Sequence, residues 1–178
     1  TAAITEDSGS YTTRAMRTSP KLAMSIRETP QSVSVVTRQR MDDQGMRDLN
    51  DAVKGVTGLT VQQYGPARVK YAARGFDVDN IMYDGLPTSI STYTQDVISA
   101  ADLAMFDRVE VVRGATGLMQ GAGNPAAAIN MVRKRPTQDF RASLQGSVGT
   151  WDRYRSEADV SGPLNSEGTL RGRAVVAY

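Results

Sequence analysis

The alternation of hydrophobic and polar residues divides the chain into a mixed first part and a strictly alternating last part. In the first part, short Val-rich runs predict strands, and two segments of helical character end at Gly45 and Gly55. The predicted strands are residues 32–37, 59–63, 70–74, 81–83, 108–112 and 127–132. The predicted helices are residues 39–44 and 47–54, with a helical turn that ends near Met105. These elements predict an α+β domain with a small mixed four-stranded sheet and short helices.

After Pro136, hydrophobic and polar residues alternate with a period of two. Residues 140–148, 153–161 and 170–178 each alternate apolar with polar side chains, and a polar hairpin over residues 162–168 joins the last two runs. One apolar and one charged face suit the first antiparallel strands of a transmembrane β-barrel. Alternation by itself also fits, and by itself favours, an ordinary amphipathic antiparallel sheet. Because a barrel needs at least about eight strands, three would be an incomplete part of one.

Residues 1–29 are rich in Ser, Thr and Arg and have no sustained period, so we expect an extended or mobile N-terminal arm. Residues 1–10 lack a secretory pattern, which suggests a mature or trimmed start. No apolar run approaches the roughly 20 residues of a transmembrane helix. Any crossing of a bilayer would then use strands.

Composition excludes several kinds of chemistry. The chain has no Cys and no His, which removes disulfides, thiolate ligands and the commonest general base and metal ligand. A resident metal or other cofactor is not expected, and any metal handled by this chain would arrive already chelated. The formal charge is +2 with dispersed basic residues, so nucleic acid is not an expected partner.

A Gly-rich segment offers one alternative function. Residues 121–126 match the loose dinucleotide pattern GxGxx[GA], and Asp139 lies at nearly the spacing of its ribose-binding acid. That motif requires a helix after the glycines, whereas residues 126–133 favour a strand. A soluble nucleotide-binding α/β enzyme is therefore an alternative function. A helix over residues 126–133 would support it, and a strand there would contradict it.

Acidic groupings are the remaining candidates for catalysis or calcium binding. They are Asp42 with Asp43, and Asp77 with Asp79 and Asp84. None has the spacing of an EF-hand loop, and capping or turn formation is the expected role of acids beside Gly and Asn.

Residues 106–136 contain two strand patterns joined by a connection that carries Gly114, Gly117, Gly121 and Gly123. This stretch resembles the end of the plug domain of TonB-dependent outer-membrane receptors. Upstream motifs follow the order of that family: residues 27–37 (RETPQSVSVVT), 73–76 (ARGF) and 84–87 (DGLP). The chain departs from the family pattern at Ala115, where Pro is usual, and at Ala126 and Ala127, where a Gly pair is usual.

Further segments are similar to receptors for ferric pyoverdine or pseudobactin: residues 6–11, 114–118 and 147–157. The resemblance implies an arm (1–29), a plug domain (30–137) and the first strands of an incomplete outer-membrane barrel (138–178). It implies uptake of a ferric siderophore across the outer membrane of a Gram-negative bacterium, with no reaction catalysed. The implied partners are the chelate, TonB, the rest of the barrel and lipid. A stand-alone periplasmic binding module is another alternative, which a native chain continuing past Tyr178 in alternating strands would argue against.

The resemblance also implies site residues. Tyr64, Arg68 and Tyr93 fall on the loops that contact the chelate, where Tyr rings and an Arg fork could hold an anionic ligand. Solvated loop residues are the ordinary alternative for this trio. Arg74 and Arg113 correspond to arginines that pair with glutamates of the barrel wall, and a pairing within the plug itself is the alternative. Ile4 and Thr5 are candidates for contact with TonB, although that segment could lie upstream of Thr1.

Overall fold

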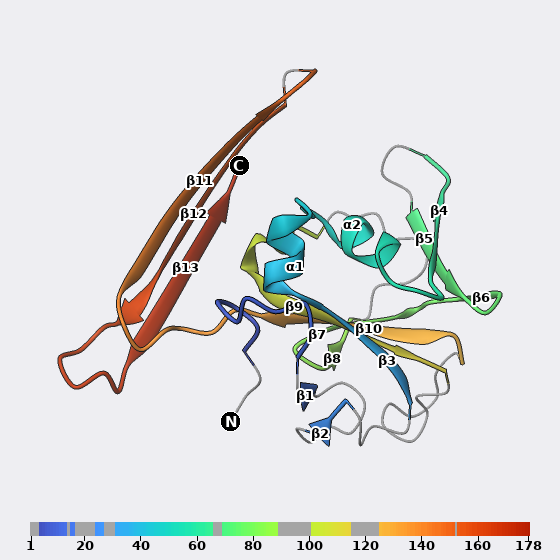
Figure 1. The fold of residues 1–178 in the computed structure, drawn as a ribbon, viewed down its shortest axis with the longest axis horizontal. Coiled ribbons are helices and arrows are strands. Elements are labelled where there is room, and N and C mark those ends of the chain that lie inside the picture. The colour runs from blue at the N-terminus through green and yellow to red at the C-terminus, as the bar shows by residue number, and fades with distance from the viewer. Residues whose placement is uncertain are drawn as a thin grey trace. The chain divides into compact units, whose positions relative to one another are not determined.

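The computed structural model describes residues 4–13, 15, 16, 24–26, 31–65, 69–88, 101–114, 125–151 and 153–178. The chain splits into two compact units, Thr1–Arg133 and Lys134–Tyr178 (Figure 1). The division falls four residues before the predicted boundary at 137/138.

Unit 1 is built on a five-stranded sheet with the order β3-β9-β10-β7-β8. Its strands are β3 (Ser32–Thr37), β7 (Asn80–Tyr83), β8 (Leu86–Pro87), β9 (Phe106–Arg113) and β10 (Ala127–Arg133). β7 and β10 run parallel and the other neighbours antiparallel, which confirms the predicted small mixed sheet. The strand beyond the predicted four is β8, because Asp84 and Gly85 turn the chain back with φ of 51° and 83°.

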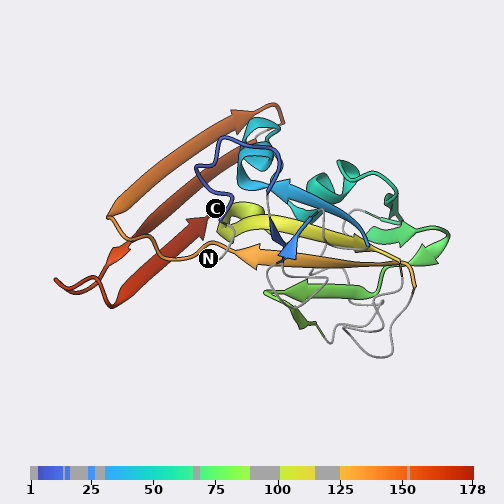
Figure 2. The same cartoon turned by 60° about the horizontal axis from the view of Figure 1, so that its bottom comes forward.

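Two short helices cover one face of this sheet (Figure 2). They are α1 (Arg38–Asp43) and α2 (Leu49–Lys54), close to the predicted ranges, and a 3-10 helix η2 (Leu103–Met105) precedes β9. The side chains of Thr37 and Asp48 cap the two α-helices by accepting backbone N–H groups. Apolar residues of the sheet and helices form one core: Val36, Met41, Leu49, Val53, Val109, Val111, Ile129 and Met131 are fully buried.

A separate three-stranded sheet extends from unit 1. It consists of β4 (Thr60–Gln63), β5 (Val69–Ala73) and β6 (Phe76–Asp77), in that order. The turn between β5 and β6 is Arg74-Gly75, with φ of 54° and 83°. Two-residue strands β1 (Ala15–Met16) and β2 (Met24–Ser25) pair antiparallel within the stretch predicted to be an arm.

Unit 2 is an antiparallel sheet of β11 (Arg141–Gly149), β12 (Arg153–Pro163) and β13 (Arg171–Ala177). The predicted antiparallel strands are therefore confirmed. Register places Leu144 beside Ala158 and Ala158 beside Val176 on one face, and Gln145 beside Glu157 on the other. Among the described residues, no helix has the length and hydropathy needed to span a bilayer.

Candidate functional site

Arg74, in the turn between β5 and β6, lies near Arg113, at the end of β9, so that the charge of Arg74 acts on Arg113. Arg113 ends β9, and its guanidinium donates to the carbonyl of Thr57 (2.6 Å), to Ser32 Oγ (3.1 Å) and to the carbonyl of Val33 (3.4 Å). Burial, followed by the positive charge of Arg74, lowers the pKa of Arg113. Neutral oxygens hold Arg113 in place but do not cancel its charge, so the pair forms a cationic site.

Unusual backbone conformations occur at Arg74 and at Gly114, next to Arg113. Arg74 takes a positive φ of 54°, which is unfavourable for a residue with a Cβ atom. A Cβ atom built on Gly114 would lie 3.5 Å from Arg74 Nη1, and Gly114 itself has a φ of 104°. The Arg74 guanidinium therefore lies beside the chain just after β9, at a distance where a Cβ atom would make an ordinary van der Waals contact, and it is the positive φ that favours glycine at 114. Within the part of the chain that the structure describes, neither arginine has a carboxylate partner.

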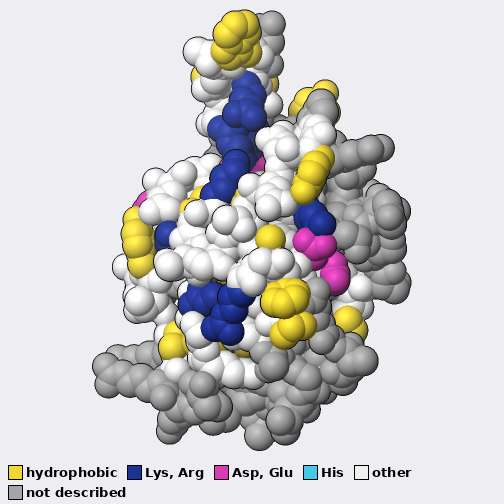
Figure 3. Space-filling model, turned by 90° about the vertical axis from the view of Figure 1, so that its right-hand side faces the viewer, with side chains coloured by type: hydrophobic (Ala, Val, Ile, Leu, Met, Phe, Trp, Pro, Cys, Tyr) yellow, Lys and Arg dark blue, Asp and Glu magenta, His cyan; other side chains and the backbone are white. Residues whose placement is uncertain are grey.

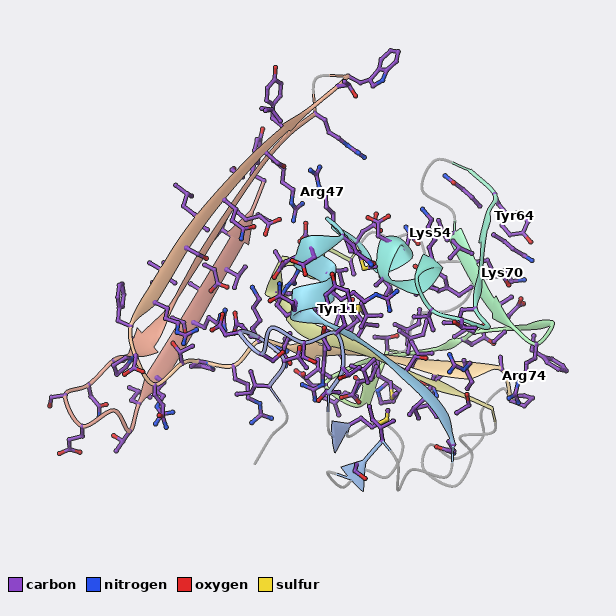
Figure 4. All side chains as sticks on the ribbon, viewed as in Figure 1. Tyr11, Arg47, Lys54, Tyr64, Lys70 and Arg74 are labelled. Atoms are coloured by element: carbon purple, nitrogen blue, oxygen red, sulfur yellow. The ribbon has the colours of Figure 1, made fainter. Side chains whose placement is uncertain are left out.

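The hairpin of β4 and β5 carries Tyr64, whose ring is 68% exposed (Figure 4). Its hydroxyl donates to Gln62 Oε1 at 2.9 Å, which orients the ring along β4. Lys70 on β5 pairs with Asp77 on β6 at 2.6 Å, and this hydrogen bond raises the pKa of Lys70. Arg68 and Tyr93, the other predicted ligand contacts, lie outside the described residues. Figure 3 shows Lys and Arg side chains gathered in patches on one face, next to hydrophobic side chains.

A buried polar cluster fixes the N-terminal segment, residues 4–13. Asp107 accepts the backbone N–H of Thr5 (3.0 Å) and of Glu6 (2.8 Å), while the Thr5 hydroxyl donates to the Asp107 carbonyl (2.8 Å). The N–H of Arg38 donates to Thr5 Oγ1 (3.0 Å), and the Arg38 guanidinium donates to the carbonyls of Leu103 and Phe106 (2.8 and 3.0 Å). Residues 4–13 of the predicted arm are therefore anchored to unit 1.

This anchoring bears on the candidates for TonB contact. Thr5 is 1% exposed, whereas Ile4 is 56% exposed. Thr5 cannot contact another protein while it is docked. Asp107 was not among the predicted site residues, although charged residues in an otherwise apolar strand were a signal. Asp107, Arg108 and Glu110 are all buried, and Arg108 pairs with both acids.

The acidic residues considered for catalysis or calcium have structural partners. Asp84 binds the N–H and side chain of Arg133, Asp42 pairs with Arg38, and Asp43 accepts from Tyr11. Among the described residues, no three His, Cys, Asp or Glu side chains are grouped to hold a metal ion.

The dinucleotide-binding alternative is wrong. Residues 127–133 form strand β10, which pairs with β9 and β7, so no helix follows the glycine segment at this point. Without a helix N-terminus there, the motif lacks the partial positive charge that would bind a pyrophosphate.

One face of unit 2 is apolar and exposed. Leu144 and Val148 on β11 are 82% and 79% exposed. Aromatic residues are found at both ends of the unit: Trp151, Tyr154 and Tyr178 near the β11–β12 turn, and Phe140 before β11. The opposite face carries ion pairs, including Arg155 with Glu157 and Arg173 with Asp159. An aliphatic band flanked by aromatic residues is typical of strands whose outer face contacts lipid.

Comparisons with known proteins identify the family. The profile of the TonB-dependent Receptor Plug Domain matches residues 25–128, so the chain belongs to the family of TonB-dependent receptor plug domains. The ferripyoverdine receptor of Pseudomonas aeruginosa is 49% identical over 176 residues, which cover 98% of this chain and 22% of that protein. The ferric-pyoverdine 358 receptor of Pseudomonas putida is 48% identical over 174 residues, covering 97% of this chain and 21% of the relative.

Solved structures agree with this assignment. The crystal structure of the ferripyoverdine receptor of the Pseudomonas aeruginosa outer membrane, bound to ferripyoverdine, aligns with a TM-score of 0.93 and 48% identity over 99% of this chain and 24% of that one. The alcaligin outer-membrane receptor of Bordetella pertussis aligns with a TM-score of 0.90 and 46% identity, covering 99% of this chain and 31% of that one. The chain thus spans about a fifth of the length of the curated relatives.

Proposed function

We propose that this chain is the plug and the first barrel strands of a TonB-dependent receptor that takes up a ferric siderophore of the pyoverdine type across the outer membrane of a Gram-negative bacterium. The iron is cargo and arrives inside the chelate, so the chain needs no metal site of its own. Transport, not catalysis, is the activity.

The observation that carries the proposal is similarity across both units at once. Identity to the two pyoverdine receptors is 48–49% over 97–98% of the chain, so it includes the unit 2 strands as well as the plug region. A shared plug alone would support receptor membership. The continuous match supports the more specific assignment to a pyoverdine-type ligand.

The dimensions of unit 2 support a position in the outer membrane. β11 has nine residues, and at about 3.3 Å per residue it extends about 30 Å. Tilted by about 40°, it crosses about 23 Å, which is close to the apolar band of outer-membrane barrels. The exposed Leu144 and Val148 would contact lipid, and the ion-paired opposite face would line the lumen. A stand-alone periplasmic module would instead expose this apolar face to water, which is unfavourable.

Within this function, we assign two groups of residues. Tyr64, Arg68 and Tyr93 contact the chelate: the exposed ring of Tyr64 offers a stacking surface, and Arg68 offers a charged fork for anionic oxygens. Arg74 and Arg113 pair with glutamates of the barrel wall and hold the plug in place. Their mutual proximity supports the second role, because two adjacent guanidinium groups attract carboxylates.

The test is uptake by the full-length receptor in a host that lacks its own pyoverdine receptors. Cells should accumulate radioactive iron from ferripyoverdine, and deletion of the host TonB should abolish accumulation while surface binding persists. Accumulation that is unaffected by TonB deletion, or absence of ferripyoverdine binding to the purified receptor, would contradict the proposal.

A further inference from the structure

The boundary between the two units falls on a single peptide bond, between Arg133 and Lys134. Arg133 is held entirely within unit 1. It is the last residue of β10, its N–H donates to Asp84 Oδ1 at 2.9 Å, and its guanidinium pairs with the other oxygen of the same carboxylate. Both the backbone and the side chain of Arg133 are therefore fixed to the turn between β7 and β8.

Lys134, the next residue, is held within unit 2. Its Nζ donates to Asp159 Oδ2 on β12 at 2.9 Å. Arg173 on β13 donates to the same carboxylate at 2.6 and 2.8 Å, and it also donates to the carbonyl of Arg135 at 2.9 Å. The side chains of Lys134, Asp159 and Arg173 are only 9–12% exposed. Charge-assisted bonds at such largely enclosed positions are among the stronger ones in proteins.

A second contact follows three residues later. The N–H of Thr137 donates to Ser161 Oγ at 2.8 Å, and the two hydroxyl oxygens lie 2.9 Å apart. Ser161 is 2% exposed and lies two residues after Asp159 on β12, hence on the same face of the strand. Residues 134–137, which we call the linker, are thus bound to unit 2 at both ends.

We propose that the linker stays fixed to β12 and β13 when the plug rearranges during transport, and that the backbone at Arg133 and Lys134 is the pivot of that movement. Rotation at this peptide unit leaves the Asp84 and Asp159 contacts intact. Peeling the linker away would instead break the Lys134–Asp159 ion pair, the bond from Arg173 to the Arg135 carbonyl and the Thr137–Ser161 pair. The inference rests on the proposed function, because it takes unit 1 as the plug and unit 2 as the barrel wall.

A disulfide between positions 137 and 161 tests the proposal in the full-length receptor. Thr137→Cys combined with Ser161→Cys places two thiols where two hydroxyl oxygens lie 2.9 Å apart. If the linker never leaves the wall, the oxidised receptor should take up ferripyoverdine within about twofold of the rate of the same protein after reduction. Loss of uptake on oxidation and its recovery on reduction would overturn the proposal.

Hydrogen exchange provides a readout that does not depend on transport. In the purified receptor, the Thr137 amide should exchange slowly, and Asp159→Asn should speed exchange across residues 134–137 by roughly tenfold or more. Glu157→Gln is the matched control, because Glu157 lies on the same strand and face but pairs with Arg155. Fast exchange of the Thr137 amide in the wild-type protein, or equal effects of the two substitutions, would contradict the proposal that the linker is fixed to β12 and β13. If neither the wild-type nor the reduced double-Cys receptor takes up ferripyoverdine, the proposed function fails, and exchange still decides whether the linker is fixed.

Discussion

The Asp107 carboxylate accepts the backbone N–H of Thr5 at 3.0 Å, although 102 positions separate the two residues. Residues 4–13 are therefore docked on unit 1, and they are held where β9 begins. Apolar contact contributes little to this docking, because Ile4 and Tyr11 remain about half exposed. The hydrogen bonds of Thr5, Glu6, Ser10 and Tyr11 carry most of it.

The first prediction is that Thr5→Val releases this segment without unfolding the plug. Valine keeps the shape of threonine but cannot donate to the Asp107 carbonyl or accept from the Arg38 N–H. Loss of these bonds at a buried position should cost about 1–3 kcal/mol of docking free energy. Hydrogen exchange of residues 4–11 should accelerate, whereas Thr5→Ser should restore protection. Thr12→Val is the control, because Thr12 is exposed; an equal effect there would contradict the role of Thr5.

A second prediction concerns the arginine pair. Arg74→Ala combined with Arg113→Ala should loosen the plug in the intact receptor, because barrel glutamates would lose their buried partners at a cost of about 3–5 kcal/mol for each broken pair. Limited proteolysis should cut unit 1 faster, while affinity for ferripyoverdine changes little. Arg171→Ala, at an exposed arginine, should leave cleavage unchanged. Unaltered protease resistance of the double variant would count against the proposed pairing.

The third prediction tests the chelate contacts. Arg68→Ala should weaken ferripyoverdine binding by about 1.5–3 kcal/mol, or roughly ten- to a hundredfold, because a charge-assisted hydrogen bond is lost. Arg68→Lys should weaken binding less, since the charge remains but the fork does not. Tyr64→Phe keeps the aromatic ring and removes the hydroxyl, so it should retain the affinity for ferripyoverdine that Tyr64→Ala loses. Titration of the purified receptor, followed by quenching of chelate fluorescence, measures all four; wild-type affinity of Arg68→Ala would remove Arg68 from the site.

Local patterns predicted much of this fold. Short runs rich in β-branched residues located β3, β9 and β10, and Gly45 and Gly55 marked the ends of α1 and α2 to within a residue or two. These signals are local, because each strand or helix needs only its own periodicity and stop residues. The two faces of the unit 2 strands were equally predictable, since the alternation of polar and apolar residues assigns each side chain to a face.

Contacts between distant segments could not be derived in this way. Nothing in residues 4–6 indicates that Asp107 will accept their amides, because backbone donors are the same in every residue. Likewise, β4 and β5 were predicted as strands, but the local sequence of each does not indicate that they pair with each other and with β6 in a sheet of their own. For the site, the sequence resemblance supplied Arg74 and Arg113, while their closeness around Gly114 came from the structure.

The fourth prediction is a loss of plug stability at alkaline pH. Burial, followed by the nearby Asp48 charge, raises the pKa of Tyr71, whose hydroxyl donates to Asn50 at 2.6 Å. The folded state therefore holds this proton more tightly than the unfolded chain, where the tyrosine pKa is about 10. The contribution is fully present below about pH 10 and is lost as the pH rises towards the folded pKa.

Tyr71→Phe should flatten this alkaline decline in the urea-induced unfolding free energy of the receptor. Asn50→Ala is the control, because it removes the hydrogen-bond acceptor but keeps the titrating group. Some decline should remain in Tyr71→Phe, since burial also raises the pKa of Tyr83. Identical pH profiles for Tyr71→Phe and the wild-type protein would show that another group is responsible.

The fifth prediction compares adjacent residues on opposite faces of β11. Leu144→Arg should destabilise the receptor in lipid vesicles by about 2–4 kcal/mol, because it places a charge in the hydrocarbon region. Gln145→Arg should cost far less, since Gln145 pairs in register with Glu157 on the polar face. Unfolding free energies in vesicles measure the difference. Equal costs for the two substitutions would contradict the assignment of the faces.

The strand order of the unit 1 sheet has a consequence for how the protein is made. β3 is the first strand of this sheet in the sequence, yet among the described strands it pairs only with β9, and β7 pairs with β10. Neither early strand has its central neighbour until residues 106–133 have been synthesised, so the sheet forms late and through contacts between distant residues. Folds of this kind are slow to form. A newly exported chain would therefore pass through a stage with exposed Val-rich strands, when it is most open to aggregation and most dependent on chaperones.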